Sequence, residues 1–398
     1  MNRIVLSTTA LMIMSLTTYA GGNMIPETLQ VKTLQTEKLE TETNRFIKTV
    51  NGYIRSAYER HALKSDKTFE DGAIGGKLQL QTHSYYGISL GSSFYASNAL
   101  GSSDNRGLVP FRGEVANSYA ILGEAYIQID FGKTYIKLGR QEIETPFAQM
   151  DDIGMVPNTF EAYILENKDI PDTTLFLGQI QKMAGVDADV VDKFTPINGN
   201  ENMQVLGVTY EGLEDVMLTA WYYRIKNAQV DAIAYVEASY EKENYSLGVQ
   251  YAHQSYTTGQ DASVFGVSAG ITFDAIGLSL SAAYNKMQGN AAFSGFGGGP
   301  FFSNSEYLIP DNAGIDGSQS NIGVEWDVSS IGADGLSISL GHATLQNQAN
   351  QKATETDLVV AYSLSKNIET HLIASHINAT NLGEDDANHM RVFINYTF

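Results

Sequence analysis

From residue 50 to the end of the chain, short segments with alternating apolar and polar residues follow one another. Alternation with a period of two is the pattern of a β-strand that has one apolar face and one polar face. In one segment Tyr245, Leu247 and Val249 alternate with Ser246 and Gly248. Segments of about ten residues that repeat in this way between turn residues are typical of a transmembrane β-barrel. The sequence therefore predicts an all-β fold, a transmembrane antiparallel β-barrel.

About eighteen candidate strands can be counted in this region. They lie near residues 48–59, 73–82, 84–95, 119–130, 133–141, 159–167, 173–183, 203–212, 215–225, 229–240, 244–254, 263–273, 277–286, 320–328, 335–344, 354–363, 368–377 and 389–398. The number is even, as a single antiparallel barrel with both ends on one side requires, and about sixteen strands is the alternative, because segment boundaries carry an error of a few residues. Barrels of about 16 to 18 strands enclose an aqueous channel.

The connections between candidate strands differ in length. Short ones lie at 130–133, 168–172, 212–215, 241–244, 274–277 and 363–367, and long polar ones at 96–118, 142–158, 184–202 and 287–319. A soluble β-sandwich or jelly roll also has alternating strands, but its connections at the two ends have similar lengths. Short periplasmic turns opposite long outer loops are the pattern of an outer-membrane barrel, which the sequence therefore favours.

The amino-terminal region has the pattern of an export signal. Arg3 is followed by an apolar stretch at 4–16 and by the small-x-small sequence Thr18-Tyr19-Ala20. This apolar stretch is too short to cross a bilayer as a helix. We therefore expect a signal peptide at 1–20, a periplasmic lead-in at 21–47 and the barrel at 48–398, in the outer membrane of a Gram-negative bacterium.

Composition excludes several classes of function. The chain has no Cys, so a thiolate nucleophile, a thiolate zinc site and an iron–sulfur cluster are impossible. With 25 Lys and Arg against 45 Asp and Glu, the net charge of −20 opposes nucleic-acid binding. The sequence Gly87-Ile88-Ser89-Leu90-Gly91 matches a hydrolase pattern but lies inside an alternating strand instead of a strand-to-helix turn. No catalytic residue, cofactor or metal site is predicted.

One stretch resembles a known family. Lys137-Leu138-Gly139-Arg140-Gln141, Thr145-Pro146, Asp151-Asp152 and the run from Met155 to Glu161 are similar to the OprD-like family of outer-membrane porins. The resemblance implies an eighteen-stranded channel for small nutrients. It also implies that the segment after the fifth strand folds inward as a loop that narrows the pore, and it places Asp151 and Asp152 on that loop.

Strand phase indicates which charged side chains face the lumen. The candidate pore residues are the basic Arg55, Lys77, Lys137 and Arg391, the acidic Glu124, Glu325 and Asp327, the loop residues Asp151 and Asp152, and Arg140. Opposed charges at a constriction select and orient solutes, although each of these groups is equally an ordinary solvated charge of the wall. Arg140 is ambiguous, because strict alternation points it toward lipid and only a bulge would turn it inward.

The predicted function is that of a porin, a passive diffusion channel for ions and small water-soluble solutes such as amino acids or small carboxylates, with a modest preference for cations. The expected partners are outer-membrane lipid, the solutes and the barrel assembly machinery, which the resemblance links to a terminal aromatic residue, here Phe398. The protein is expected to be a monomer or a homotrimer. The alternative is a non-transporting structural or adhesive barrel that displays the loop at 287–319 on the cell surface.

Overall fold

The computed structural model describes residues 46–398, apart from 66, 101–110, 113–114, 117 and 384. The predicted signal peptide at 1–20 and almost all of the predicted lead-in at 21–47 lie outside the described residues, so both assignments stay predictions.

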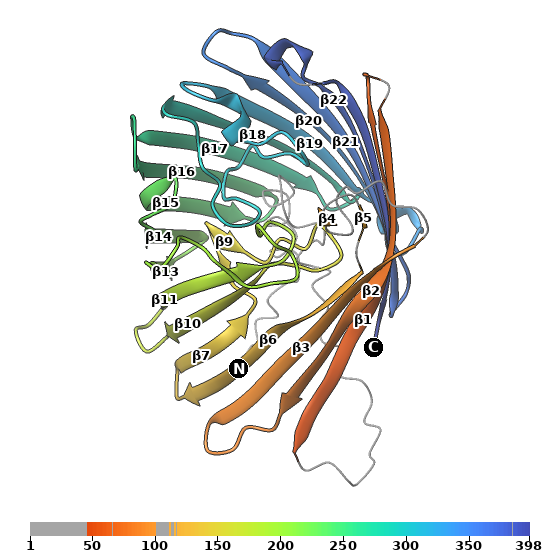
Figure 1. Cartoon of the computed structure of the whole chain (residues 1–398). Helices are drawn as coiled ribbons and strands as arrows, with labels where there is room; N and C mark the ends of the chain where they lie inside the picture. Colours follow the sequence, from red (N-terminus) through yellow and green to blue (C-terminus); the bar gives the residue numbers. More distant parts are fainter. Residues whose placement is uncertain (1–45, 66, 101–110, 113–114, 117, 384) are drawn as a thin grey trace.

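Eighteen strands form a closed antiparallel barrel (Figure 1), which confirms the predicted fold class and the larger strand number. Successive wall strands pair along the chain, and β23 pairs with β1 from Tyr53 opposite Thr397 to Leu63 opposite Ala387, so the wall has no free edge. The wall strands are β1 (Ile47–Leu63), β2 (Thr68–Thr82), β3 (Ile88–Ala99), β6 (Tyr119–Phe131), β7 (Thr134–Gln141), β10 (Thr159–Asn167), β11 (Thr173–Ala184), β13 (Met203–Leu213), β14 (Val216–Arg224), β15 (Val230–Lys242), β16 (Tyr245–Tyr256), β17 (Ala262–Phe273), β18 (Leu278–Gly289), β19 (Ser318–Asp327), β20 (Leu336–Gln346), β21 (Lys352–Ser365), β22 (Ile368–Asn378) and β23 (Ala387–Thr397).

The remaining elements are short and lie in the connections. They are β4 (Phe111–Arg112), β5 (Val115–Ala116), β8 (Glu144–Thr145), β9 (Ala148–Gln149), β12 (Thr195–Pro196) and the 3-10 helices η1 (Pro310–Ala313), η2 (Val328–Ile331) and η3 (Thr380–Leu382). Within the described part of the chain, no helix is both long enough and apolar enough to cross a membrane.

The two faces of the wall follow the alternation in the sequence. On β16 the outward side chains of Val249 and Tyr251 are 49% and 43% exposed, whereas the inward Gln250 and Ala252 are buried. Exposed apolar residues on the outer face, among them Tyr245 and Tyr251, form the band that contacts lipid. The sequence alone therefore predicts the orientation of the wall side chains.

Two long outer loops fold into the barrel, and we call them the first inward loop (residues 142–158) and the second inward loop (residues 290–317). Their Phe147 and Phe301 are buried and lie 6.0 Å apart, measured between ring centroids. The first inward loop lies in the segment that the resemblance identified. The second overturns the alternative of a displayed surface loop at 287–319, because Phe301, Phe302 and Leu308 are buried in the lumen instead of facing water.

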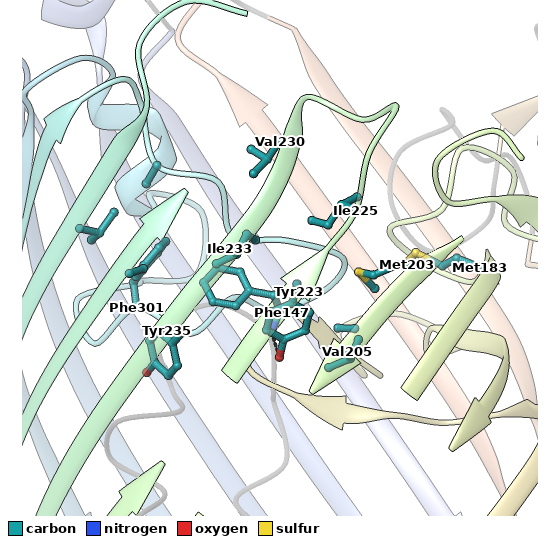
Figure 2. Packing of buried hydrophobic residues seen from close by; sticks show 14 of the residues in the cluster. Phe147, Met183, Met203, Val205, Tyr223, Ile225, Val230, Ile233, Tyr235 and Phe301 are labelled. Carbon is teal, nitrogen blue, oxygen red and sulfur yellow. Dashed lines mark hydrogen bonds between the residues drawn. The ribbon is translucent and has the colours of Figure 1, made fainter. Parts of the chain in front are cut away.

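Aromatic packing holds these loops against the inner wall (Figure 2). The ring of Phe147 makes edge contacts with Tyr223 on β14 and Tyr235 on β15, at centroid distances of 5.4 and 5.7 Å. The surrounding cluster continues onto inward apolar residues such as Ile233 and Val205. No pattern in the sequence predicted this apolar cluster. The cluster therefore fills part of the lumen, and the polar passage runs along the rest of the inner wall.

Candidate functional site: the pore constriction

Arg55 on β1 is the most completely bonded charge in the lumen. Its guanidinium donates to both carboxylate oxygens of Asp152, at 2.6 and 2.8 Å, and to the carbonyl oxygen of Gly154 at 2.6 Å. Its Nε donates to Asn395 on β23 at 2.8 Å, and the side chain is buried. A bidentate pair of this kind has fixed geometry. Arg55 therefore anchors the first inward loop to the wall and has no side-chain nitrogen left for a solute.

Arg391 on β23 joins the two inward loops to each other. It donates to the Glu306 carboxylate of the second loop at 2.7 Å and to the carbonyl oxygen of Ile153 in the first loop at 3.3 Å. The ring of Tyr307 lies 5.3 Å from its guanidinium carbon. Burial raises the pKa of the Glu306 carboxyl to about 7, although the Arg391 guanidinium opposes this rise.

The two lumen lysines, Lys77 and Lys137, both lie close to the carboxylate of Glu124. Lys77 Nζ lies 2.8 Å from Glu142 Oε1 and 3.2 Å from Glu124 Oε2, and Lys137 Nζ lies 3.7 Å from Glu124 Oε1. Tyr95 donates its hydroxyl to Glu142 at 2.7 Å. Glu124, which strand phase had placed in the lumen, is therefore a counter-ion of the lysines. Glu142, at the start of the first inward loop, was not predicted.

Glu355 on β21 holds the second inward loop. Its buried carboxylate accepts hydrogen bonds from the Ser305 hydroxyl at 2.9 Å and from the backbone N–H groups of Tyr307 and Leu308 at 2.9 and 2.6 Å. The sequence analysis missed this residue. The sequence shows Glu355 only as an acidic residue at an inward position of a strand. This pattern does not indicate that a loop folds back and contacts it.

Asp151 and Asp152 both lie on the first inward loop, but neither presents a free charge to the passage. Asp152 is paired with Arg55. Asp151 is buried, and burial, followed by the nearby Asp187 carboxylate, raises its pKa well above the ordinary value. Burial therefore disfavours the charged form of this carboxyl. The charge that selects ions has to come from elsewhere in the lumen.

An acidic, hydroxyl-rich recess lies on the other side of the passage. It is lined by Ser246, Ser268, Ser281, Ser339, Glu306, Glu325 and Asp357, among others. In the described part of the chain, Glu325, Asp327 and Asp357 form no ion pair with Lys, Arg or His. These three carboxyl groups therefore have no cationic side chain beside them.

The placement of Arg140 in the lumen was wrong. Arg140 pairs across the sheet with Glu161, and their side chains lie 3.8 Å apart on the same face as Tyr163, which is 48% exposed. Lys182 on β11 contacts the other side of Glu161 at 2.8 Å. β7 keeps its register with both neighbours, so no bulge reverses the side chain. Arg140 therefore faces outward, near the outer end of its strand.

A closed barrel with an apolar outer face and a charged lumen narrowed by two loops is an outer-membrane channel. The family model for outer membrane porins of the OprD family matches residues 60–398. The chain belongs to this family, and it is an outer-membrane porin.

Solved structures share the fold. OccAB4 from Acinetobacter baumannii superposes with a TM-score of 0.77 at 14% identity, with 90% of this chain and 99% of that chain covered. A BenF-like porin from Pseudomonas fluorescens has a TM-score of 0.76 at 15% identity, covering 88% and 98%. OpdK from Pseudomonas aeruginosa, solved with vanillate, has a TM-score of 0.74 at 15% identity, covering 88% and 98%. No curated protein sequence matches this chain significantly.

Proposed function

We propose that this porin is a passive channel that prefers cations, including protonated amines and the ammonium end of amino acids. The observation that supports this most directly is the balance of charges in the lumen. The four basic residues predicted to face the lumen, Arg55, Lys77, Lys137 and Arg391, are all in ion pairs with carboxylates of the same chain.

Carboxyl groups without a cationic partner line the recess, among them Glu325 and Asp357. A ring or patch of carboxylates lowers the energy of a cation that has lost part of its hydration, and it repels anions. A carboxylate solute would have to displace one of the internal ion pairs before it could bind a lumen cation. We therefore place amino acids and cations ahead of small carboxylates as solutes.

Reversal potentials across a planar bilayer in a salt gradient test this function. We expect the refolded wild-type channel to prefer potassium over chloride. The double variant Glu325→Gln and Asp327→Asn should lose part of this preference, because it removes two carboxyl groups that form no ion pair and do not bond to the inward loops. Asp327 also accepts a hydrogen bond from the Ser329 N–H at 3.0 Å.

Glu70→Gln is the matched control, since Glu70 contacts Arg60 at an exposed site at 3.2 Å and does not line the recess. Its reversal potential should equal that of the wild type. A wild-type channel that prefers chloride, or a double variant with unchanged selectivity, would refute the proposed cation preference.

We also propose that the last strand presents Phe398 to the barrel assembly machinery. Phe398 lies at the chain end with 42% of its surface exposed. An accessible terminal aromatic residue on the closing strand supports this role.

A further inference from the structure

Two histidines meet where the first and last strands close the barrel. His61 on β1 and His389 on β23 are register partners near the outer ends of their strands. Their Nδ1 atoms lie 2.6 Å apart, and their ring centroids are 3.4 Å apart with an angle of 57° between the ring planes. The function proposed above makes no use of this pair.

Two imidazole nitrogens that face each other at this distance require a positively polarised atom between them. A single shared proton is one solution, with one ring as donor and the other as acceptor. A metal ion is the other solution, because the lone pairs of both Nδ1 atoms then converge on it. Two nitrogens bound to a tetrahedral zinc ion at about 2.0–2.1 Å lie roughly 3.3 Å apart. The observed contact is shorter than this separation, so the two rings have to move apart when an ion binds.

The surroundings of the pair suit a bound cation. Glu59 occupies the next inward position of β1, and Asp71 is its partner on β2, so carboxylates lie next to the histidines in the lumen wall. The nearby Arg391 is compensated by Glu306 at 2.7 Å. These carboxyl groups offset part of the positive charge that Arg391 places near the pair.

The aromatic ring of Tyr307 ties the pair to the second inward loop. It stacks on His389 with a centroid distance of 3.8 Å and an angle of 26° between the ring planes. His389 is buried, whereas His61 is partly exposed. An ion that reaches the pair from the outer mouth would therefore sit against the loop that narrows the passage.

We propose that His61 and His389 form a binding site for a divalent transition-metal ion, Zn²⁺ or Cu²⁺, at the outer mouth of the channel. Imidazole is a suitable ligand for both ions. Across the residues that the structure describes, no group of three or more His, Cys, Asp or Glu side chains is arranged around a metal ion. Water therefore completes the coordination shell, and the ion exchanges with the medium.

Metal binding to the refolded, untagged mature chain tests the site without reference to transport. Zn²⁺ is titrated by calorimetry, and Cu²⁺ is examined by electron paramagnetic resonance, which reports nitrogen ligands. We expect one ion per barrel and two nitrogen ligands. His61→Gln and His389→Gln should each weaken binding at least about tenfold, since either change removes one of two protein ligands.

His376→Gln and His342→Gln are the control variants, because both residues are exposed and bond to Asn388 and Thr356 instead of to a second histidine. They should bind as the wild type does. Heat-modifiable migration in gels verifies that each barrel is folded. The proposal would be overturned if the folded wild type bound no metal ion, or if His61→Gln and His389→Gln bound it as tightly as the wild type. The pair would then hold a shared proton. EDTA should reverse any binding.

Discussion

At the scale of single residues, Asp152 and Asp151 are neighbours in different surroundings, since Asp152 pairs with Arg55 and Asp151 is buried beside Asp187. Asp152 neutralises the buried Arg55, so Asp152→Asn leaves a buried guanidinium without its counter-ion. Removing one partner of a buried pair costs about 3–5 kcal/mol. We expect a lower free energy of unfolding in urea and a reversal potential shifted toward anions.

Asp151→Asn is the comparison for that change. Burial and Asp187 raise the pKa of Asp151, which disfavours its charged form, so its amide analogue should alter selectivity less than Asp152→Asn does. Equal shifts of the reversal potential in the two variants would show that the charge assignment is incorrect.

At the scale of an element, the second inward loop depends on one carboxylate of the wall. Glu355→Ala removes the acceptor of three hydrogen bonds from Ser305, Tyr307 and Leu308. Buried donors left without an acceptor destabilise the loop in its inward position. We expect a larger single-channel current and more frequent transitions between current levels.

Glu325→Ala is the matched variant for this prediction, because Glu325 lines the recess but does not bond to the loop. Glu325→Ala should change the ion preference, and transitions between current levels should be as frequent as in the wild type. Current traces of Glu355→Ala that match the wild type would mean that the aromatic cluster around Phe147 alone holds the loop.

At the scale of the whole molecule, closure of the barrel depends on the end of the chain. The backbone of Phe398 exchanges two hydrogen bonds with Gly52 on β1, each 3.1 Å long. If the exposed ring also contacts the assembly machinery, deletion of Phe398 should lower the fraction of chains that reach the outer membrane as folded barrels. Heat-modifiable migration of membrane fractions measures this fraction.

Phe131→Ala controls for the loss of an exposed aromatic residue, since Phe131 is 80% exposed at the end of β6 and is not terminal. Assembly that falls equally in both variants would argue against a special role for the chain end.

The sequence by itself determined the wall of this protein. Strand alternation is a local property with a period of two, so it indicates which side chains face lipid and which face the lumen, and it predicts about eighteen strands with sixteen as the alternative. For this reason Arg55, Lys77, Lys137 and Arg391 were placed on the inner face without knowledge of any contact. The resemblance over residues 137–161 added the first inward loop.

The tertiary structure alone decided what those lumen charges do. Arg55 bonds to Asp152 and Asn395, which are 97 and 340 positions away along the chain. Contacts between residues so far apart leave no pattern in the local sequence, because they depend on how the loops fold into the lumen of the closed barrel. The same is true of Glu355 and the second inward loop, and of the histidine pair between β1 and β23. Local periodicity determines the faces of the barrel, whereas contacts between distant segments determine which of its charges remain available to a solute.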